Sequence, residues 1–297
     1  MKAPRRAIDG VLLLDKPLGL SSNAALQRVK KLYNAEKAGH SGTLDPLATG
    51  LLPVLFGEAT KFGAFLLDSD KAYVARLHFG IRTSTGDAEG EVLSRRVADF
   101  DLGRLKEAVA AFIGPISQVP PMYSALKREG RALYEYARAG QTLERKPRAV
   151  FIHLLEIEEF APPFAVLRIR CSKGTYIRTL AEDLGEVLGC GAHLSALRRV
   201  GAGRFGMEKT VELDTLEATA EPARDNYLLP LDALLADLPE VRLNAEETRR
   251  FCQGQALRAM ENLQADRVRV LGDGGQFLGI GKIDSQGQLQ PRRLLRN

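Results

Sequence analysis

The chain has 297 residues and an ordinary apolar content, so it is long enough for about two globular domains without a disulfide framework. Its three cysteines, Cys171, Cys190 and Cys252, form no Cys-x-x-Cys pair and its four histidines are scattered, which excludes the ligand spacing of structural zinc and favours a reducing, cytoplasmic location. The net charge of +5 favours a polyanionic partner.

The first predicted elements are a strand and a helix. The basic amino terminus is followed by an apolar run, Val11 to Leu14, that is too short for a signal peptide, and no stretch approaches the roughly 20 apolar residues of a membrane span. Residues 8–14 predict a short buried strand that ends in a turn over residues 15–19. Ser21 or Ser22 then caps a helix with an apolar face (Leu26, Val29 and Leu32).

A loop rich in glycine and proline, residues 38–53, follows this helix and carries a single carboxylate, Asp45. Glycine allows positive φ and close backbone approach, and Pro46 pushes Asp45 toward an extended conformation. Such a loop holds one carboxylate at a fixed place. Asp followed by Pro is also an ordinary helix start, and from this dipeptide alone the helix cap is the favoured interpretation.

The next elements alternate between strands and helices. Residues 52–56 predict a strand and residues 58–67 a short helix. Residues 71–79 alternate cleanly, with Tyr73 on the same face as three apolar residues (Ala75, Leu77 and Phe79). A polar turn follows at residues 83–87, and Asp101 caps the next helix.

The segment 117–148 differs in character from the rest. Between Met122 and Arg148 it contains seven basic and three acidic residues, interleaved with Tyr123, Tyr134 and Tyr136. A solvated charged helix would explain this pattern. Basic and aromatic side chains together also suit an RNA-binding surface, because they neutralise phosphates and stack on bases.

Residues 150–158 and 164–171 predict two strands, and Thr175 is the expected N-cap of a helix that ends at Gly189. Arg178 lies in the first turn of that helix, where the helix dipole disfavours a cation by up to about 1 kcal/mol. This placement suggests a specific anionic partner, although an exposed arginine in water is the simpler alternative. Residues 192–200 continue as a strand.

The last part of the chain predicts a small β domain. We place a boundary near Pro239, so that residues 1–239 and 240–297 form two domains. Residues 240–297 contain short alternating runs, a Gly-rich hairpin turn at residues 272–275, and ten basic against seven acidic residues. This composition indicates a small β-barrel that binds RNA.

Four strings carry a family resemblance, which covers most of residues 8–205. They are Lys16–Ser22 (Lys-Pro-x-Gly-x-Ser-Ser), His40–Gly50, Lys173–Leu180 and Ala192–Val200. Together they resemble the bacterial tRNA pseudouridine-55 synthases, the TruB family of pseudouridine synthases. Ser41 stands where threonine is more frequent and preserves the hydroxyl. The C-terminal residues resemble, more weakly, the PUA domain that ends bacterial members.

The resemblance implies an α+β fold, in which helices flank a central mixed, largely antiparallel sheet and a small PUA-like β-barrel follows. It implies a catalytic nucleophile, Asp45, paired with Arg178, and an insertion at about 117–148 that grips the T arm of tRNA. We expect Lys127, Arg128, Arg131, Arg145 and Lys146 to contact RNA there. No cofactor or metal is expected, because the isomerisation needs no redox change.

The same resemblance assigns the pocket residues. Tyr73 stacks on the flipped uracil and takes part in proton transfer, Tyr176 and Leu197 line the pocket, and His40 lies near the space that the base vacates. Each residue also has a simpler explanation: core packing for Tyr73, Tyr176 and Leu197, and a hydrogen bond within its own loop for His40. Asp45 either attacks the ribose C1′ or the uracil ring, or removes a proton from C2′.

Three functions therefore compete. The first is a monomeric tRNA pseudouridine synthase that needs neither a guide RNA nor a protein partner and acts on the T-loop uridine. The second is an RNA chaperone that folds tRNA without catalysis, an activity that can coexist with the first. The third is a catalytic subunit that depends on a guide RNA; the basic insertion argues against it, because the insertion itself would supply recognition.

Overall fold

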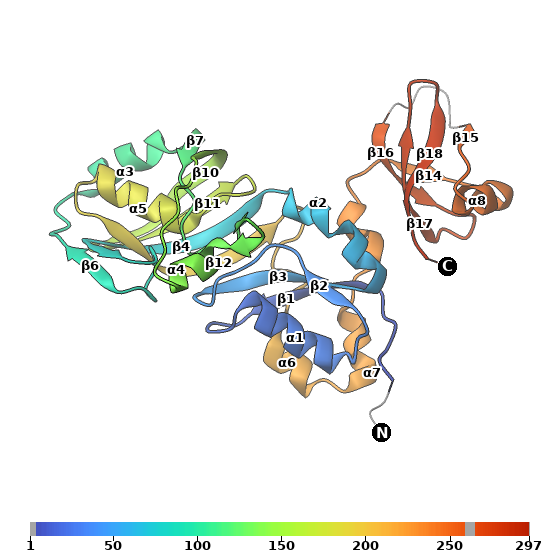
Figure 1. The fold of residues 1–297 in the computed structure, drawn as a ribbon, viewed down its shortest axis with the longest axis horizontal. Helices are drawn as coiled ribbons and strands as arrows, with labels where there is room; N and C mark the ends of the chain where they lie inside the picture. The colour runs from blue at the N-terminus through green and yellow to red at the C-terminus, as the bar shows by residue number, and fades with distance from the viewer. Residues whose placement is uncertain (1–3, 259–264, 297) are drawn as a thin grey trace.

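The structure is a computed structural model that describes residues 4–258 and 265–296, and its two main sheets lie at opposite ends of an elongated molecule (Figure 1). The strands are β1 (Gly10–Lys16), β2 (Ala38–His40), β3 (Ala48–Phe56), β4 (Lys71–Phe79), β5 (Ile81–Thr83), β6 (Val92–Arg95), β7 (Gly114–Gln118), β8 (Lys127–Arg128), β9 (Arg131–Ala132), β10 (Arg148–Ala161), β11 (Phe164–Cys171), β12 (Ala192–Ala202), β13 (Val211–Glu212), β14 (Glu240–Arg242), β15 (Leu257–Arg258), β16 (Ala265–Leu271), β17 (Phe277–Ile283) and β18 (Gln288–Leu294). The α-helices are α1 (Ser22–Leu32), α2 (Gly63–Leu67), α3 (Leu102–Ala111), α4 (Leu133–Arg138), α5 (Ile177–Val187), α6 (Leu213–Ala218), α7 (Glu221–Arg224) and α8 (Ala245–Cys252), and the 3-10 helices are η1 (Gly57–Phe62), η2 (Asp225–Tyr227) and η3 (Leu231–Leu235).

The larger sheet is mixed and largely antiparallel, and helices flank it, which confirms the predicted α+β class. Its strand order is β13-β1-β3-β12-β4-β11-β10-β7, with β2 paired to β3. β1–β13 and β3–β12 are parallel pairs, and the other pairs of this sheet are antiparallel. The parallel contact places Ala48 opposite Leu197 and Gly50 opposite Arg199. The loop before β3 therefore lies beside the second half of β12.

Alternating side chains of this sheet form separate cores on its two faces. In β1, Leu12 and Leu14 pack with α1 and α6, whereas Val11 and Leu13 pack with η1 and η3. Strands β4, β10, β11 and β12 contribute to a third core that includes α3 and α5. None of the described helices is long and apolar enough to cross a membrane.

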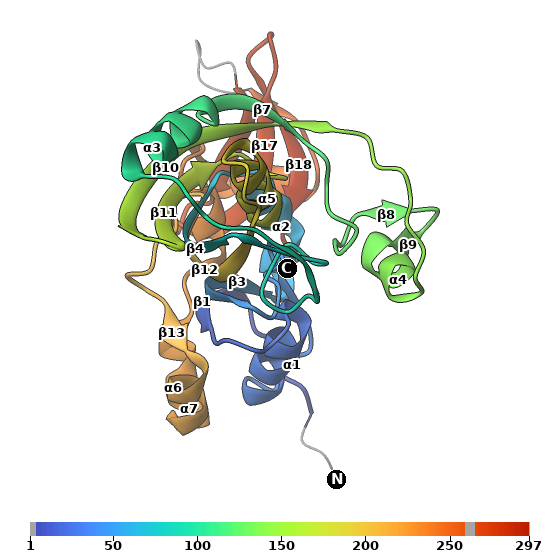
Figure 2. The same ribbon diagram turned by 90° about the vertical axis from the view of Figure 1, so that its left-hand side faces the viewer.

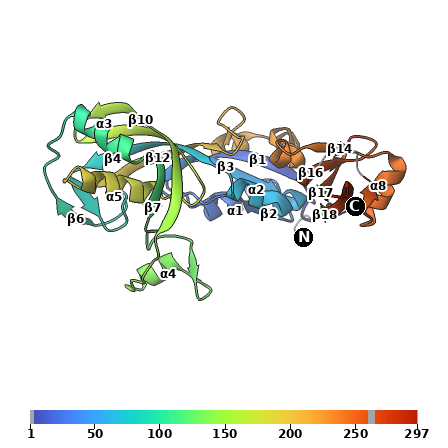
Figure 3. The same ribbon diagram turned by 90° about the horizontal axis from the view of Figure 1, so that it is seen from above.

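Residues 119–147, between β7 and β10, project from the body of the molecule (Figure 2, Figure 3). They form the short hairpin β8–β9 followed by α4. Lys127 and Lys146 are exposed on this projection. The insertion therefore offers a separate surface beside the main sheet.

The C-terminal sheet has the order β14-β16-β17-β18-β15 and curls into a half-barrel with its own core around Phe251. It also packs against the first sheet, because Phe277, Ile280 and Leu295 join the cluster that contains Phe62. Lys61 Nζ donates to the Leu294 carbonyl at 3.0 Å.

Two of the predicted helix starts differ from the structure. The helix expected at residues 58–67 begins as the 3-10 helix η1 and becomes α2 only at Gly63. Thr175 is not the N-cap of α5: Tyr176 occupies that position without a side-chain cap. The Thr175 hydroxyl instead donates to the Ser172 carbonyl at 2.9 Å, because Thr175 lies one residue too early and closes the preceding turn.

Candidate active site

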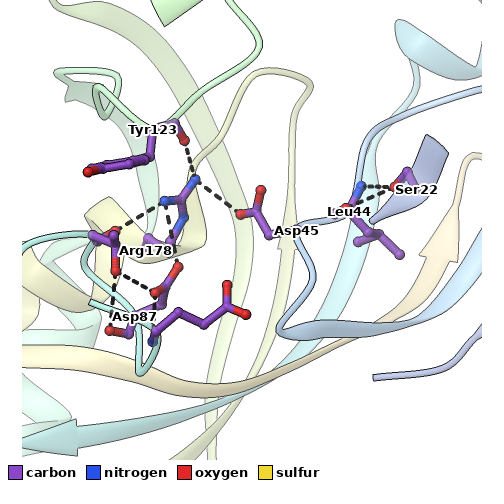
Figure 4. Close-up of polar contacts among 8 residues, drawn as sticks. Ser22, Leu44, Asp45, Asp87, Tyr123 and Arg178 are labelled. Carbon is purple, nitrogen blue, oxygen red and sulfur yellow. Dashed lines mark hydrogen bonds and ion pairs between the residues drawn. The ribbon is translucent and has the colours of Figure 1, made fainter. Parts of the chain in front are cut away.

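The loop that carries Asp45 leads into a strand, so the helix-cap alternative is wrong. Pro46 and Leu47 form a turn closed by the Ala48 amide on the Asp45 carbonyl at 3.0 Å, and β3 begins at Ala48. The preceding residue is fixed from the start of α1: the Ser22 hydroxyl accepts from the Leu44 amide at 2.7 Å and donates to its carbonyl at 2.9 Å (Figure 4). These bonds hold Asp45 as part of a rigid turn.

Arg178 joins Asp45 to two other segments of the chain (Figure 4). Its Nη2 lies 3.0 Å from Asp45 Oδ2 and donates to the Tyr123 carbonyl at 2.6 Å. Its Nη1 lies 3.6 Å from Asp87 Oδ2 and donates to the Thr85 carbonyl at 3.1 Å. One guanidinium thus contacts the loop that carries Asp45, the turn after β5 and the base of the insertion.

The two carboxylates beside Arg178 have different surroundings. The Asp45 side chain is 42 % exposed to the cleft, whereas that of Asp87 is 4 % exposed. Burial raises the pKa of Asp45, Arg178 opposes that rise, and Asp87 adds to it. Asp87 also accepts a hydrogen bond from the Thr85 hydroxyl at 2.5 Å. Asp87 is therefore a fixed structural anion, and Asp45 is the accessible one.

A cleft of about 360 Å³ opens in front of Asp45. Tyr73, Tyr176 and Leu197 all line it, together with Asp45 and Arg178. The structure thus brings five residues predicted for the site to one place. The packing explanation also holds for two of them, because Tyr73 and Leu197 contact the apolar clusters on both sides. Burial raises the pKa of Tyr176, whose backbone exchanges two hydrogen bonds with Gln118.

His40 does not belong to the cleft lining. It lies in β2 opposite Val54 of β3. Its Nδ1 is buried and has no hydrogen-bond partner, so the proposed bond within its own loop is absent at that atom. Burial and the positive charge of Arg199 lower the pKa of His40, which favours the neutral ring.

The basic residues predicted to contact RNA lie on the projecting insertion, but their surroundings differ. Arg128 donates to the Glu144 carbonyl, Arg131 pairs with Glu135 and stacks over Tyr136, and Arg145 donates to the Pro120 carbonyl. Lys127 and Lys146 are exposed without such a bond in the described structure. The arginines therefore also shape the insertion, whereas the two lysines are available to a partner.

Sequence reasoning missed Asp87, Tyr123 and Arg199 as members of the site. In the sequence, Asp87 is one of several polar residues in a predicted turn and nothing distinguishes it as a site residue. Tyr123 contributes its backbone carbonyl, which no side-chain pattern can reveal. Arg199 was part of a matching strand, but nothing indicated its burial, with 1 % exposure. Only the tertiary fold brings these residues beside Asp45 and Arg178.

The arrangement can support nucleophilic or general-base chemistry by a carboxylate. It offers one accessible carboxylate, a guanidinium that favours its ionised form, and aromatic walls suited to a planar base. Among residues 4–258 and 265–296, no group of three or more His, Cys, Asp or Glu side chains could hold a metal ion.

Three family models together match nearly the whole chain. Residues 30–177 match the TruB family pseudouridylate synthase N-terminal domain, residues 178–236 match the tRNA pseudouridylate synthase B C-terminal domain, and residues 239–295 match the pseudouridine synthase II TruB C-terminal model. A tRNA pseudouridine synthase B of Burkholderia mallei is 55 % identical over 98 % of both chains. One of Cupriavidus pinatubonensis is 54 % identical over 99 % of this chain and 96 % of its own.

Solved structures resemble the fold as well. The chain superimposes with a TM-score of 0.72 and 26 % identity on a chain from a Cbf5-Nop10-Gar1 complex, over 96 % of this chain and 84 % of the other. A chain from an H/ACA RNP bound to a substrate RNA gives the same TM-score at 25 % identity, over 97 % and 85 % of the two chains.

Proposed function

Since the chain belongs to the TruB family of pseudouridylate synthases and is thus an isomerase, we propose that it acts on tRNA and converts the T-loop uridine at position 55 to pseudouridine. The observation that carries this proposal is the accessible Asp45 carboxylate, which Arg178 holds at 3.0 Å in a cleft with aromatic walls. Relatives at 54–55 % identity that carry the name tRNA pseudouridine synthase B support tRNA as the substrate.

In the proposed reaction Asp45 is the nucleophile and Arg178 favours its ionised form. A stacked uridine must leave the tRNA before a carboxylate at the back of a cleft can reach it, so base flipping precedes chemistry. Tyr73 stacks on the extruded base and takes part in proton transfer, while Tyr176 and Leu197 enclose it and His40 lies toward the emptied position in the loop. Attack on C1′, attack on the ring and removal of the C2′ proton all use the same carboxylate.

We infer that the chain recognises the T arm as a monomer, without a guide RNA or an obligate protein partner. The projecting insertion carries two exposed lysines, Lys127 and Lys146, and the C-terminal half-barrel packs against the first sheet. The fold neighbours in the Cbf5 and H/ACA complexes are far less similar in sequence, at 25–26 % identity, than the relatives named tRNA pseudouridine synthase B, at 54–55 %. No cofactor takes part in the proposed chemistry, and the predicted RNA-contacting residues remain those of the insertion.

The test uses purified full-length protein and one unmodified tRNA transcript labelled with tritium at C5 of uridine. We expect release of about one tritium per tRNA without added cofactor or guide. A control transcript with cytidine at position 55 should release none. Modification at another uridine would contradict the proposed position, and no release would contradict the proposed substrate. Asp45→Asn protein that still accelerates tRNA refolding would reveal a separate chaperone activity.

A further inference from the structure

Arg199 is a buried cation that the proposed mechanism does not use. It lies in β12 with 1 % exposure, and its ion-pair partner is missing: in the described parts of the chain no carboxylate lies within 4.0 Å of its guanidinium. Its Nε donates to the Leu51 carbonyl at 2.7 Å and its Nη2 to the Gly42 carbonyl at 3.0 Å. Burying an arginine without a carboxylate is costly, so a gain elsewhere must offset the cost.

The neighbour of this guanidinium that takes part in the proposed mechanism is the side chain of Tyr73. Burial, and with it the positive charge of Arg199, also lowers the pKa values of three basic residues, His40, Lys16 and Lys71. Arg199 and Tyr73 lie directly opposite each other on the antiparallel strands β12 and β4, and both line the Asp45 cleft. Directly opposite residues of an antiparallel pair point to the same face, so the two side chains are neighbours. Burial raises the pKa of Tyr73, and the positive charge of Arg199 opposes that rise.

Two glycines make room for this arginine. Gly42 has φ +81°, and a Cβ there would lie 3.1 Å from Arg199 Nη1. Gly50 has φ +96°, and a Cβ there would lie 2.3 Å from the Arg199 carbonyl oxygen. Gly42 belongs to the loop that carries Asp45, and Gly50 belongs to β3, which follows it. Gly42 thus lies against the Arg199 guanidinium, whereas Gly50 lies against the Arg199 backbone.

We propose that Arg199 is a positioning residue for proton transfer, which holds the Tyr73 hydroxyl in the cleft and stabilises its phenolate form. The inference rests on the proposed function, in which Tyr73 meets the extruded uracil. Conversion of uridine to pseudouridine adds one proton to N1 and removes one from C5. A tyrosine that gives its proton to N1 and later takes the C5 proton, whose electron pair returns to the ring, ends the cycle unchanged. Arg199 balances the negative charge between the two transfers.

A titration that needs no RNA tests the Arg199–Tyr73 pair. The protein is labelled with 3-fluorotyrosine at its seven tyrosines, and Tyr73→Phe identifies the Tyr73 resonance in the fluorine spectrum. Loss of Arg199 removes what lowers the pKa of Tyr73, so Arg199→Gln should move this titration upward by about one pH unit or more. Arg199→Lys, which keeps the charge and loses the planar fork, should lie between it and the unsubstituted protein.

Arg198→Gln is the matched control, because Arg198 is the next residue of β12 and pairs with Asp15 at the surface instead. It should leave the Tyr73 titration unchanged. Single-turnover rates on the tRNA transcript provide the second readout: Arg199→Lys should lower the rate at least tenfold and leave the Kd for tRNA within about threefold. The single-turnover rate of Arg199→Lys should also level off at a higher pH than that of the unsubstituted protein.

An unchanged Tyr73 titration in folded Arg199→Lys would overturn the inference even if the enzyme modifies tRNA. If the substitution shifts the Tyr73 titration but the unsubstituted protein does not modify tRNA, the proposed function is contradicted. The interaction between Arg199 and Tyr73 is then still supported. If Arg199→Gln does not fold, Arg199→Lys decides alone, and equal loss of rate and of tRNA affinity in it would indicate a purely structural arginine.

Discussion

At the scale of single residues, the Arg178 side chain interacts with two carboxylates that differ in burial, Asp87 and Asp45. Asp87 is buried and would be costly as a lone charge, whereas Asp45 is open to the cleft and must be ionised in the proposed mechanism. The guanidinium lies between them and is oriented by the Thr85 and Tyr123 carbonyls. The buried carboxylate therefore fixes the arginine, and the arginine favours the ionised form of the accessible carboxylate.

Asp45→Asn should abolish turnover and leave tRNA affinity within a few fold, because phosphate and shape contacts dominate binding. Folding raises the pKa of Asp45, so the folded protein binds that proton more tightly than the unfolded chain does, and ionisation at neutral pH costs stability. The Tm of Asp45→Asn at pH 7 should therefore equal or exceed that of the unsubstituted protein. The gain should shrink as pH falls through the raised pKa. A large loss of Tm, measured by calorimetry, would instead assign Asp45 a structural role.

Arg178→Ala should lower the free energy of unfolding by about 3–5 kcal/mol, because it leaves the buried Asp87 carboxylate unpaired. Arg178→Ala/Asp87→Asn should recover much of this stability and remain nearly inactive at neutral pH. Urea unfolding and turnover measured on the same preparations separate the two effects. Equal stability of the single and double variants would show that Asp87 does not depend on Arg178.

Arg178→Ala should regain some turnover as pH rises, since the pKa of Asp45 increases without its partner.

At the scale of elements, local patterns predict those segments whose own residues decide the structure. The alternation in residues 71–79 and 164–171 gives β4 and β11 with the predicted bounds, and Ser21 and Asp101 cap α1 and α3 through their side chains. The contacts that build the site are not local. Arg178 meets Asp87 and Tyr123 only because β12 and α5 return beside the early strands, and no sequence spacing encodes that approach.

The insertion should bind RNA mainly through its unpaired lysines. Lys127→Ala and Lys146→Ala should each weaken tRNA binding and reduce the slope of log K against log salt by about one, because each removes one phosphate contact. Lys106→Ala, on the exposed side of α3, is the control and should change neither quantity. Filter binding from low to physiological salt measures both. A slope unchanged in either insertion variant would remove that lysine from the interface.

At the scale of the whole molecule, the C-terminal half-barrel is attached by a shared apolar cluster and a small polar contact. Glu58 lies at the centre of the polar contact: Lys61 donates to its carboxylate, and so does the Arg296 amide, at 2.8 Å. Arg293 Nη1 donates a hydrogen bond to the Lys61 carbonyl at 2.5 Å. The two sheets are thus fixed relative to each other.

Glu58→Gln should lower the free energy of unfolding at pH 7 by about 1–2 kcal/mol, since the side chain is 17 % exposed and loses charge-assisted bonds. Burial raises the pKa of Glu58, but the bonds from Lys61 and Arg296 bring it below its ordinary value of 4.5. Its contribution is therefore complete above that value and is lost as pH falls through the lower pKa of the folded state. Urea unfolding against pH measures this window. Glu107→Gln, at an exposed pair on α3, should stay within about 0.5 kcal/mol at every pH.

The two hydrogen bonds between the Ser22 hydroxyl and the Leu44 backbone should also affect how fast the Leu44 amide exchanges its hydrogen with solvent. A loop amide ordinarily exchanges its hydrogen with solvent quickly, but the Leu44 amide is held by a buried hydroxyl on the first turn of α1. Its exchange should be as slow as that of the β3 amides, because it can open only when α1 separates from the sheet. Ser22→Ala should speed Leu44 exchange by at least tenfold and leave β4 amides unchanged. The loop that carries Asp45 then belongs, on the scale of minutes to hours, to the core and not to the surface.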